Sequence, residues 1–276
     1  MPSADPPTGR PAAAPHAKTG LSSVSSAARL LKEFRHGERD LGVTELSRRL
    51  GLGKSTVHRI LTTLTAEGLL EREPTSGLYR LGLAMYDLGS NVPIHRDIHQ
   101  LALPVMEALR QQTQESLHVA VRDGREVVYV ERLESQQTVR TFMRIGHRNW
   151  AHCTSTGKVL LAFLPGDQLE SLLDGWDLVR KTDRTISGLD ELRAELVRVR
   201  SRGYGTNVNE SEPGVASVAA PIRDSRGEVL AALSLVGPTM RLSQRSLRQF
   251  ATLVVDGAQT VSQRLGHRRT SSDCGA

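Results

Sequence analysis

Cysteine and long apolar runs are scarce in this sequence of 276 residues. Its two cysteines, Cys153 and Cys274, cannot build the disulfide framework that holds small secreted domains together. No stretch is apolar and long enough to serve as a membrane span or as the core of a signal peptide. We therefore expect a cytoplasmic protein.

A strong excess of one charge is also missing. The net charge of +6 and the pI near 9.7 permit nucleic-acid binding, but residues 21–90 hold ten Lys or Arg against eight Asp or Glu. The local cluster of Arg48, Arg49, Lys54 and Arg59, opposed only by Glu45, says more about a partner than the total does. The length and the hydrophobic content of 38% allow two modest domains, each with its own core.

Residues 43–66 carry two short amphipathic helical patterns separated by a Gly-Leu-Gly turn. Leu46 and Leu50 recur four residues apart in the first pattern, and Thr44 is placed to cap it. Gly51 supplies the left-handed conformation that a tight turn between helices requires. The second helix opens at Lys54 and is expected to bury a stripe of Val57, Ile60, Leu61 and Leu64.

The opposite face of the second helix is rich in hydrogen-bonding side chains and carries no acid. Helical spacing places five of them there: Ser55, Thr56, His58, Arg59 and Thr62. Arg59 can make a bidentate contact to guanine. Contacts to phosphates, which set the register on DNA, are expected from Thr44, Arg48, Lys54 and Ser55.

Residues 69–73 and 78–81 alternate apolar and polar side chains around turn formers, which predicts a two-stranded wing. Arg72 and Arg80 are placed on it to follow the phosphate backbone. Two helices, a tight turn and a wing in this order are typical of a winged helix-turn-helix, so double-stranded operator DNA is the first partner to consider. The alternative is a small helical hairpin with an ordinary solvated face.

The rest of the chain predicts a second domain. Strands are expected at 116–121, 126–131, 138–145, 205–209, 215–223 and 228–236, and helices at 94–113, 155–163, 167–173, 189–202 and 243–265. This order indicates an α+β fold with a mainly antiparallel sheet flanked by helices. The predicted division is a disordered tail 1–20, a winged helix-turn-helix domain 21–82, a linker helix 83–93, a second domain 94–266 and a disordered tail 267–276.

Several separated segments, in order, resemble the IclR-type bacterial transcriptional regulators. They are SVSSAARLLKEF, VTELSRRLGLGKSTVHRILTTLTAEGLL, SGLYRLG, WAHCTSTGKVLLA, RSRGYG and SVAAPIRDSRGEVLAALSLVGP. The likeness runs from Leu21 to about Leu265. It implies that the second domain is a GAF-like domain that binds a small organic metabolite as effector, and that the chain forms a homodimer or a dimer of dimers.

The resemblance also implies which residues surround the effector. Small polar side chains from separate segments are expected at the pocket: Ser155, Thr156, Asn207, Ser217 and Ser234. Asn207 and Ser217 stand where members that bind small oxoacids carry an acid and a cysteine, so their ligand is not transferred. Hydroxyl groups leading into a helix suit a carboxylate or another polar group.

Bulky side chains from the expected strand 138–145 and its following loop are candidate pocket walls. Phe142 or Met143, depending on the phase of the strand, and Trp150 are large enough to enclose a small molecule, although core packing is equally compatible. Arg140 and Arg144 share one strand face and can hold an acidic effector, but exposed arginines on a strand are more often solvated.

Catalytic and metal sites find little support in the sequence. Around Gly157-Lys158 a phosphate-binding loop would need Gly at 152 and Ser or Thr at 159, where His152 and Val159 stand. His152 and Cys153, adjacent in an extended segment, would point to opposite faces and lack a third orienting group. His95 and His99 share a helix face but lack the further ligands of a structural zinc site, and His118 in a strand is typical of a core or pocket-edge histidine.

Together these patterns predict a ligand-responsive DNA-binding regulator without catalytic residues, metal or cofactor. We expect a repressor of a catabolic or metabolic operon, with an activator as the alternative. An enzyme with a DNA-targeting arm and a constitutive architectural DNA-binding protein are the rivals from other classes.

Overall fold

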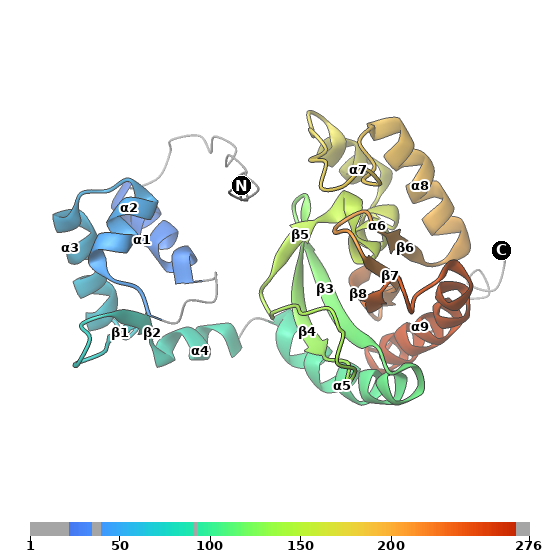
Figure 1. Ribbon diagram of the computed structural model, residues 1–276, viewed down its shortest axis with the longest axis horizontal. Helices are drawn as coiled ribbons and strands as arrows, with labels where there is room; N and C mark the ends of the chain where they lie inside the picture. The colour runs from blue at the N-terminus through green and yellow to red at the C-terminus, as the bar shows by residue number, and fades with distance from the viewer. Residues whose placement is uncertain (1–21, 35–39, 91–92, 269–276) are drawn as a thin grey trace, which may run out of the picture. The chain divides into compact units, whose positions relative to one another are not determined.

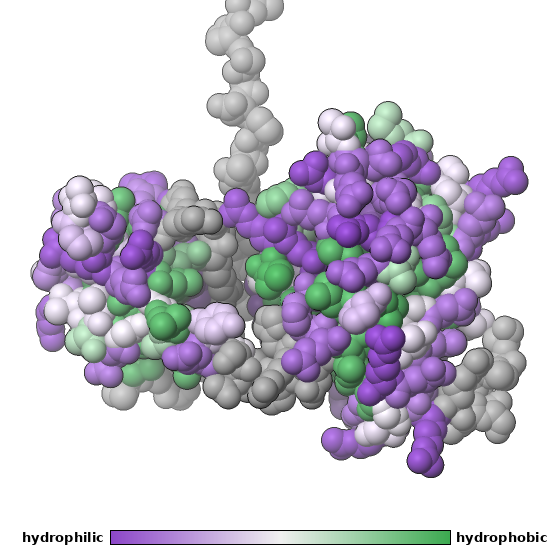
Figure 2. Space-filling model, turned by 90° about the horizontal axis from the view of Figure 1, so that it is seen from below, coloured by the Kyte–Doolittle hydropathy of each residue, from purple (hydrophilic) through white to green (hydrophobic). Residues whose placement is uncertain are grey.

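The computed structural model describes residues 22–34, 40–90 and 93–268. The chain divides into two compact units, residues 1–87 and 88–276, and each is described by itself (Figure 1). The two expected disordered tails lie outside the described residues, apart from His267 and Arg268. Polar side chains predominate on the face drawn in Figure 2, with apolar ones between them.

The first unit is a three-helix domain with a short antiparallel hairpin. Its elements are α1 (Ser22–Glu33), α2 (Val43–Leu50), α3 (Lys54–Ala66), β1 (Leu70–Arg72) and β2 (Tyr79–Leu81). Leu46, Leu50 and Leu61 pack in its core with Leu30 and Phe34, while Val24 of α1 is exposed. The predicted helix-turn-helix and wing are therefore present.

The turn between α2 and α3 depends on Gly51, whose φ of +65° lies in the left-handed region. Thr44 does not cap α2, contrary to expectation, because the helix already begins at Val43 and the cap position belongs to Gly42. Two helices follow the hairpin, α4 (Leu83–Ser90) and α5 (Pro93–Thr113).

The second unit is built on a six-stranded sheet in the order β5-β4-β3-β8-β7-β6, and every neighbouring pair is antiparallel. The strands are β3 (Ser116–Asp123), β4 (Glu126–Leu133), β5 (Arg148–Trp150), β6 (Gly205–Val208), β7 (Val215–Arg223) and β8 (Val229–Pro238). The expected α+β class is confirmed. Among the described residues no helix combines the length and apolar character needed to cross a membrane.

Helices cover both faces of this sheet (Figure 1). α5 and α9 (Gln244–Arg264) bury one face through residues such as Val119, Val218 and Leu233. The other face packs against α6 (Ser155–Ala162), α7 (Gly166–Leu173) and α8 (Leu189–Arg202) through Ala120, Ala219 and Ala232. These alanines are small, and their side leaves room for α6 to lie close to the strands.

The prediction of a strand at 138–145 is wrong. The segment has no regular structure, and two of its carbonyl groups accept from arginine side chains where a strand would pair with a neighbour: Arg241 donates to Val139 O at 2.8 Å and Arg132 to Met143 O at 2.6 Å. The chain then turns at Gly146, with φ of +80°, and the edge strand β5 forms only at Arg148–Trp150.

Candidate functional site

The exposed face of α3 carries the polar side chains that the sequence predicted for DNA. Lys54, Ser55, Thr56, His58, Arg59 and Thr62 are exposed, while Val57, Leu61 and Leu64 are buried. Ile60, expected in the buried stripe, is only half-buried. The Thr62 hydroxyl donates to His58 O at 2.9 Å, so its oxygen remains as an acceptor. The major groove admits an α-helix, and exposed side chains of these types can form hydrogen bonds to base edges.

Intramolecular ion pairs reduce the basic charge beside α3. Glu45 accepts from Arg48 at 2.6 Å and from Arg49 at 2.5 Å, and these bonds lower the pKa of Glu45 to about 2. On the wing, Arg80 pairs with Glu71 at 3.1 Å, and the Arg72 guanidinium lies 5.9 Å from the centre of the Tyr79 ring. Thr44, Arg48, Arg72 and Arg80 are all exposed.

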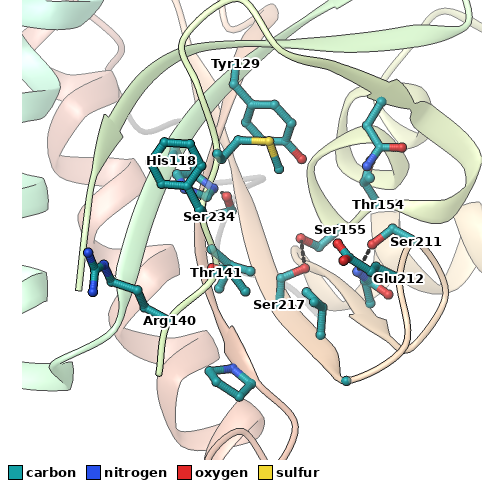
Figure 3. A pocket seen from close by; sticks show the side chains of 18 of the residues that line it. His118, Tyr129, Arg140, Thr141, Thr154, Ser155, Ser211, Glu212, Ser217 and Ser234 are labelled. Carbon is teal, nitrogen blue, oxygen red and sulfur yellow. Dashed lines mark hydrogen bonds between the residues drawn. The ribbon is translucent and has the colours of Figure 1, made fainter. Parts of the chain in front are cut away.

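In the second unit a cavity of about 410 Å³ lies on the α6 side of the sheet (Figure 3). Its floor comes from five strand residues that the pairing brings together: His118, Tyr129, Asn207, Ser217 and Ser234. His118 and Ala219 both pair with Ser234, and Asn207 pairs with Ser217, so residues over 100 positions apart share one face.

The N-terminal end of α6 forms one wall of this cavity. Thr154 caps the helix, its hydroxyl oxygen accepting from Gly157 N at 3.1 Å. Ser155 follows, and its hydroxyl lies 2.7 Å from that of Ser217, the two pointing toward one another in Figure 3. Backbone N–H groups and the positive end of the helix dipole thus meet small hydroxyl groups, an arrangement that suits a carboxylate or another polar acceptor.

The floor of the cavity is uncharged at neutral pH. Burial, with help from the nearby Arg132 and His147 charges, lowers the pKa of His118 to about 4, so its imidazole is neutral. Burial likewise raises the pKa of Tyr129 to about 12 and keeps its phenol protonated. Charged groups lie at the exposed rim instead, where Arg140 and Glu212 face solvent.

The structure brings most of the predicted effector residues together. Phe142, Ser155, Asn207, Ser217 and Ser234 line the cavity. Met143 lines it as well, since the irregular segment 138–145 does not alternate its side chains as a strand would. The Arg144 guanidinium lies over the Phe142 ring, at 5.8 Å, and Arg144 is not part of the lining.

Two predicted effector residues lie elsewhere. Thr156 is buried one position beyond Ser155, and the helical rotation turns its side chain away from the cavity lining. Trp150 packs against the apolar cluster beneath α6, with its ring 6.4 Å from that of His152. Tyr129, Asn149 and Ser211 line the cavity without having been predicted, because single polar residues in apolar strands and loops carry no distinctive spacing.

His152 and Cys153 do not form a nucleophile pair. They lie in a short 3-10 helix, Ala151–Cys153, and not in an extended segment as expected. Burial raises the pKa of Cys153 to about 12, so the thiol stays protonated, while His152 Nε2 is 3.1 Å from Val179 O.

His95 and His99 are the two histidines predicted to share a helix face. His99 bonds the buried carboxylate of Glu131, and the side chain of His95 lies outside the described part of the chain. Across residues 22–34, 40–90 and 93–268, no cluster of three or more His, Cys, Asp or Glu is arranged to hold a metal ion.

A winged helix-turn-helix and an α+β domain with a cavity of partly polar lining are the parts of a ligand-responsive DNA-binding regulator. Family comparisons agree: the IclR helix-turn-helix domain matches residues 23–74, and the C-terminal domain of the bacterial transcriptional regulator IclR matches residues 90–263. The chain belongs to the IclR family of bacterial transcriptional regulators.

Individual relatives cover most of the chain. The HTH-type transcriptional regulator KdgR of Escherichia coli is 35% identical over 230 residues, 83% of this chain and 88% of its own length. The glycerol operon regulatory protein of Streptomyces coelicolor is 36% identical over 256 residues, 90% of this chain and 98% of its own. An IclR homolog from Microbacterium hydrocarbonoxydans, solved in complex with 4-hydroxybenzoate, is 29% identical with a TM-score of 0.79, covering 88% of this chain and 99% of that one.

Proposed function

We propose that this chain represses a metabolic operon and that a small organic acid, bound in the cavity of the second unit, changes its affinity for the operator. The observation that carries the proposal is the convergence of the α6 N-terminus, Ser155 and Ser217 inside a cavity of about 410 Å³. Such a volume is within the range of small-molecule sites. The chain would act on chromosomal DNA, and therefore in the cytoplasm.

The chemistry of the cavity supports an acid that also has an apolar part. A carboxylate fits the N–H groups and hydroxyls at the start of α6. The two charges at the rim, Arg140 and Glu212, are of opposite sign. The opposite wall is apolar, since Val139, Phe142 and Met143 line it. The Microbacterium homolog, crystallised with 4-hydroxybenzoate, offers a first compound of this class to try.

We further propose that α3 enters the major groove and reads bases through Arg59, with Thr56, His58 and Thr62 beside it. Thr44, Arg48, Lys54 and Ser55 would contact phosphates, and Arg72 and Arg80 would do so from the wing. All of these side chains are exposed, which supports the proposal. One helix of this length covers only a few base pairs, so useful affinity requires two copies on neighbouring half-sites.

A homodimer supplies those two copies. Apolar side chains of β2 and α4 are unusually exposed for a protein that works alone: Leu83 is 71%, Tyr86 73% and Leu88 61% exposed, with Leu81 beside them. Burying them against a second chain would place two first units side by side. A further pairing of dimers through the second units is compatible with the same scheme.

Two measurements with the full-length chain test the proposal. Selection from a random DNA pool should enrich a pseudo-palindrome whose half-sites lie one helical turn, about 10 base pairs, or a multiple apart. Thermal unfolding with a panel of small carboxylic acids, 4-hydroxybenzoate among them, should identify at least one that raises the melting temperature of the wild type but not of Ser217→Ala. A pool without an enriched sequence would refute specific DNA binding. Equal shifts of the melting temperature in the wild type and Ser217→Ala would refute binding of the acid in this cavity.

A further inference from the structure

Lys158 is a fully buried lysine that the regulatory scheme leaves without a role. Its side chain is 2% exposed and lies in the middle of α6, outside the residues that line the cavity. Its ammonium donates to both carboxylate oxygens of Glu210, at 2.7 and 2.9 Å. A buried ion pair is costly to desolvate and seldom makes a protein more stable than an apolar pair would. Stability alone therefore does not account for Lys158 and Glu210 at these positions.

The partner Glu210 stands at the base of a cavity wall. The following residues Ser211, Glu212, Pro213 and Gly214 all line the cavity. Lys158 itself lies three positions after Ser155, which lines the cavity from α6. The ion pair therefore joins two walls that otherwise come from segments over 50 residues apart in the chain.

The other bonds of Glu210 show that this part of the loop is held on every side. Its N–H donates to Asn207 Oδ1 at 2.8 Å, and its carbonyl accepts from the Thr185 hydroxyl at 2.7 Å. Asn207 also donates through Nδ2 to the Ser211 hydroxyl at 2.9 Å. Both polar atoms of the Asn207 amide therefore bond to the loop. Of the Glu210 groups described, the carboxylate is the one that bonds to α6.

A second carboxylate makes Lys158 necessary at this place. Glu195 of α8 lies 3.9 Å from the Lys158 ammonium and is held by Arg198 and Arg202, each at 2.9 Å. Without Lys158, the buried Glu210 and Glu195 would repel each other with no cation between them. Glu195 keeps its arginines, so the loss of Lys158 would leave Glu210 as the carboxylate without a cation and would remove the bond between the loop and α6.

We propose that Lys158 is a positioning residue of the effector site, which holds the loop Ser211–Gly214 in the form that closes the cavity. The proposal rests on the proposed function, since it assigns the closed cavity to an effector. It separates the role of Lys158 from that of Ser155 and Ser217, which would touch the effector directly.

Amide hydrogen exchange of the full-length chain, read by mass spectrometry, tests the proposal without any effector. In Lys158→Met, exchange in peptides covering residues 209–214 should rise at least tenfold, while peptides of β3 and α9 keep wild-type protection. Glu210→Ala should do the same and serves if Lys158→Met does not fold. Glu210→Asp, which keeps the negative charge for Lys158, should stay closer to wild type than Glu210→Ala.

A matched control comes from the other buried ion pair near the cavity, Glu115 with Arg241 at 2.6 Å. Glu115→Gln should leave exchange at 209–214 unchanged, because Arg241 holds the opposite wall through Val139 O. Unchanged exchange at 209–214 in both Lys158→Met and Glu210→Ala would overturn the proposal. So would an increase spread evenly over β3 and α9, which would mark a purely structural role.

Calorimetric titration with 4-hydroxybenzoate as the probe extends the test to binding. If the wild type binds it, Lys158→Met should bind at least tenfold more weakly and Glu210→Asp should lose less affinity than Lys158→Met, and equal affinities in all three would overturn the proposal. If the wild type does not bind it, that choice of acid in the proposed function fails, and the exchange measurement alone decides the role of Lys158.

Discussion

At the scale of single residues, Arg59 is the side chain from which the most specific DNA contact is expected. It is exposed on α3, away from the buried Val57 and Leu61. We expect Arg59→Ala to fold normally and to lose about 1–3 kcal/mol of binding to the selected operator, because a bidentate contact to a base is removed. Fluorescence anisotropy at one fixed salt concentration measures this.

Arg59→Lys is the informative control for that experiment. It keeps the positive charge but lacks the planar fork that matches guanine. If Arg59 contacts a base, Lys should lose nearly as much specific affinity as Ala; if it only contacts a phosphate, Lys should restore most of it. If Arg59→Ala binds the operator as tightly as the wild type, the proposal that α3 reads bases in the major groove is contradicted.

His118 makes the stability of the protein depend on pH. Its pKa is about 4 in the folded protein, against about 6.5 for an unfolded histidine. Between these values the unfolded chain binds a proton that the folded chain excludes, so this contribution is complete above pH 6.5 and is lost as the pH falls toward 4. From pH 7 to pH 5 it amounts to about 2 kcal/mol.

Urea unfolding of the wild type and of His118→Gln at pH 7 and pH 5 measures this loss. The variant lacks the titrating group, so its stability should fall less over the same interval, whatever its stability at pH 7. Equal losses in the two proteins would mean that His118 is not buried as a neutral imidazole.

At the scale of elements, α6 is positioned by a close contact that only glycine permits. A Cβ on Gly157 would lie 2.2 Å from the carbonyl oxygen of Ala151, whose backbone cannot move without displacing the 3-10 turn. We expect Gly157→Ala to lower the free energy of unfolding by about 3 kcal/mol or more. Gly166→Ala, at the start of α7 with no atom within 4 Å of the added Cβ, should stay within about 0.5 kcal/mol of wild type.

Thermal unfolding of the three proteins by calorimetry compares them directly. If Gly157→Ala melts like Gly166→Ala, α6 does not lie as close to Ala151 as described, and the Ser155–Ser217 contact would lose its structural basis.

Sequence patterns predict some elements better than others for physical reasons. α3 and β7 have a continuous period of apolar residues, so the expected positions agree closely with the observed ones. The segment 138–145 alternates like a strand, yet its carbonyls bond to Arg132 and Arg241, which are distant or unremarkable in the sequence. Tertiary partners decided its structure, and no local pattern contains them.

The same limit applies to the candidate site. The resemblance to the family indicated Ser155 and Ser217 from their place in motifs, and the structure puts their hydroxyls 2.7 Å apart. Thr156 and Trp150 are not among the residues that line the cavity, since a one-residue step around a helix or one short strand decides which way a side chain points. The sequence did not predict the ion pair of Lys158, because its carboxylate partner lies 52 residues away. Lys158 entered only in the comparison with a phosphate-binding loop, which the neighbouring residues do not match.

At the scale of the whole molecule, regulation requires that the effector favour one DNA-binding state over another, because a ligand with equal affinity for both shifts nothing. Ser217 lines the cavity that we propose for the effector and lies in a different compact unit from α3. We expect Ser217→Ala to bind the selected operator within about twofold of wild type and to respond less to the acid found by thermal shift. Loss of operator binding itself in this variant would contradict the separation of the two roles.

In the proposed function, the affinity of the first unit for DNA depends on whether the cavity of the second unit holds the acid. The direct measurement is a titration of a fluorescent operator duplex with the full-length wild-type chain, at fixed salt, with and without a saturating concentration of that acid. We expect the acid to change the operator Kd by at least about fivefold, a typical allosteric coupling. Superimposable titrations, with the acid shown to be bound, would contradict it.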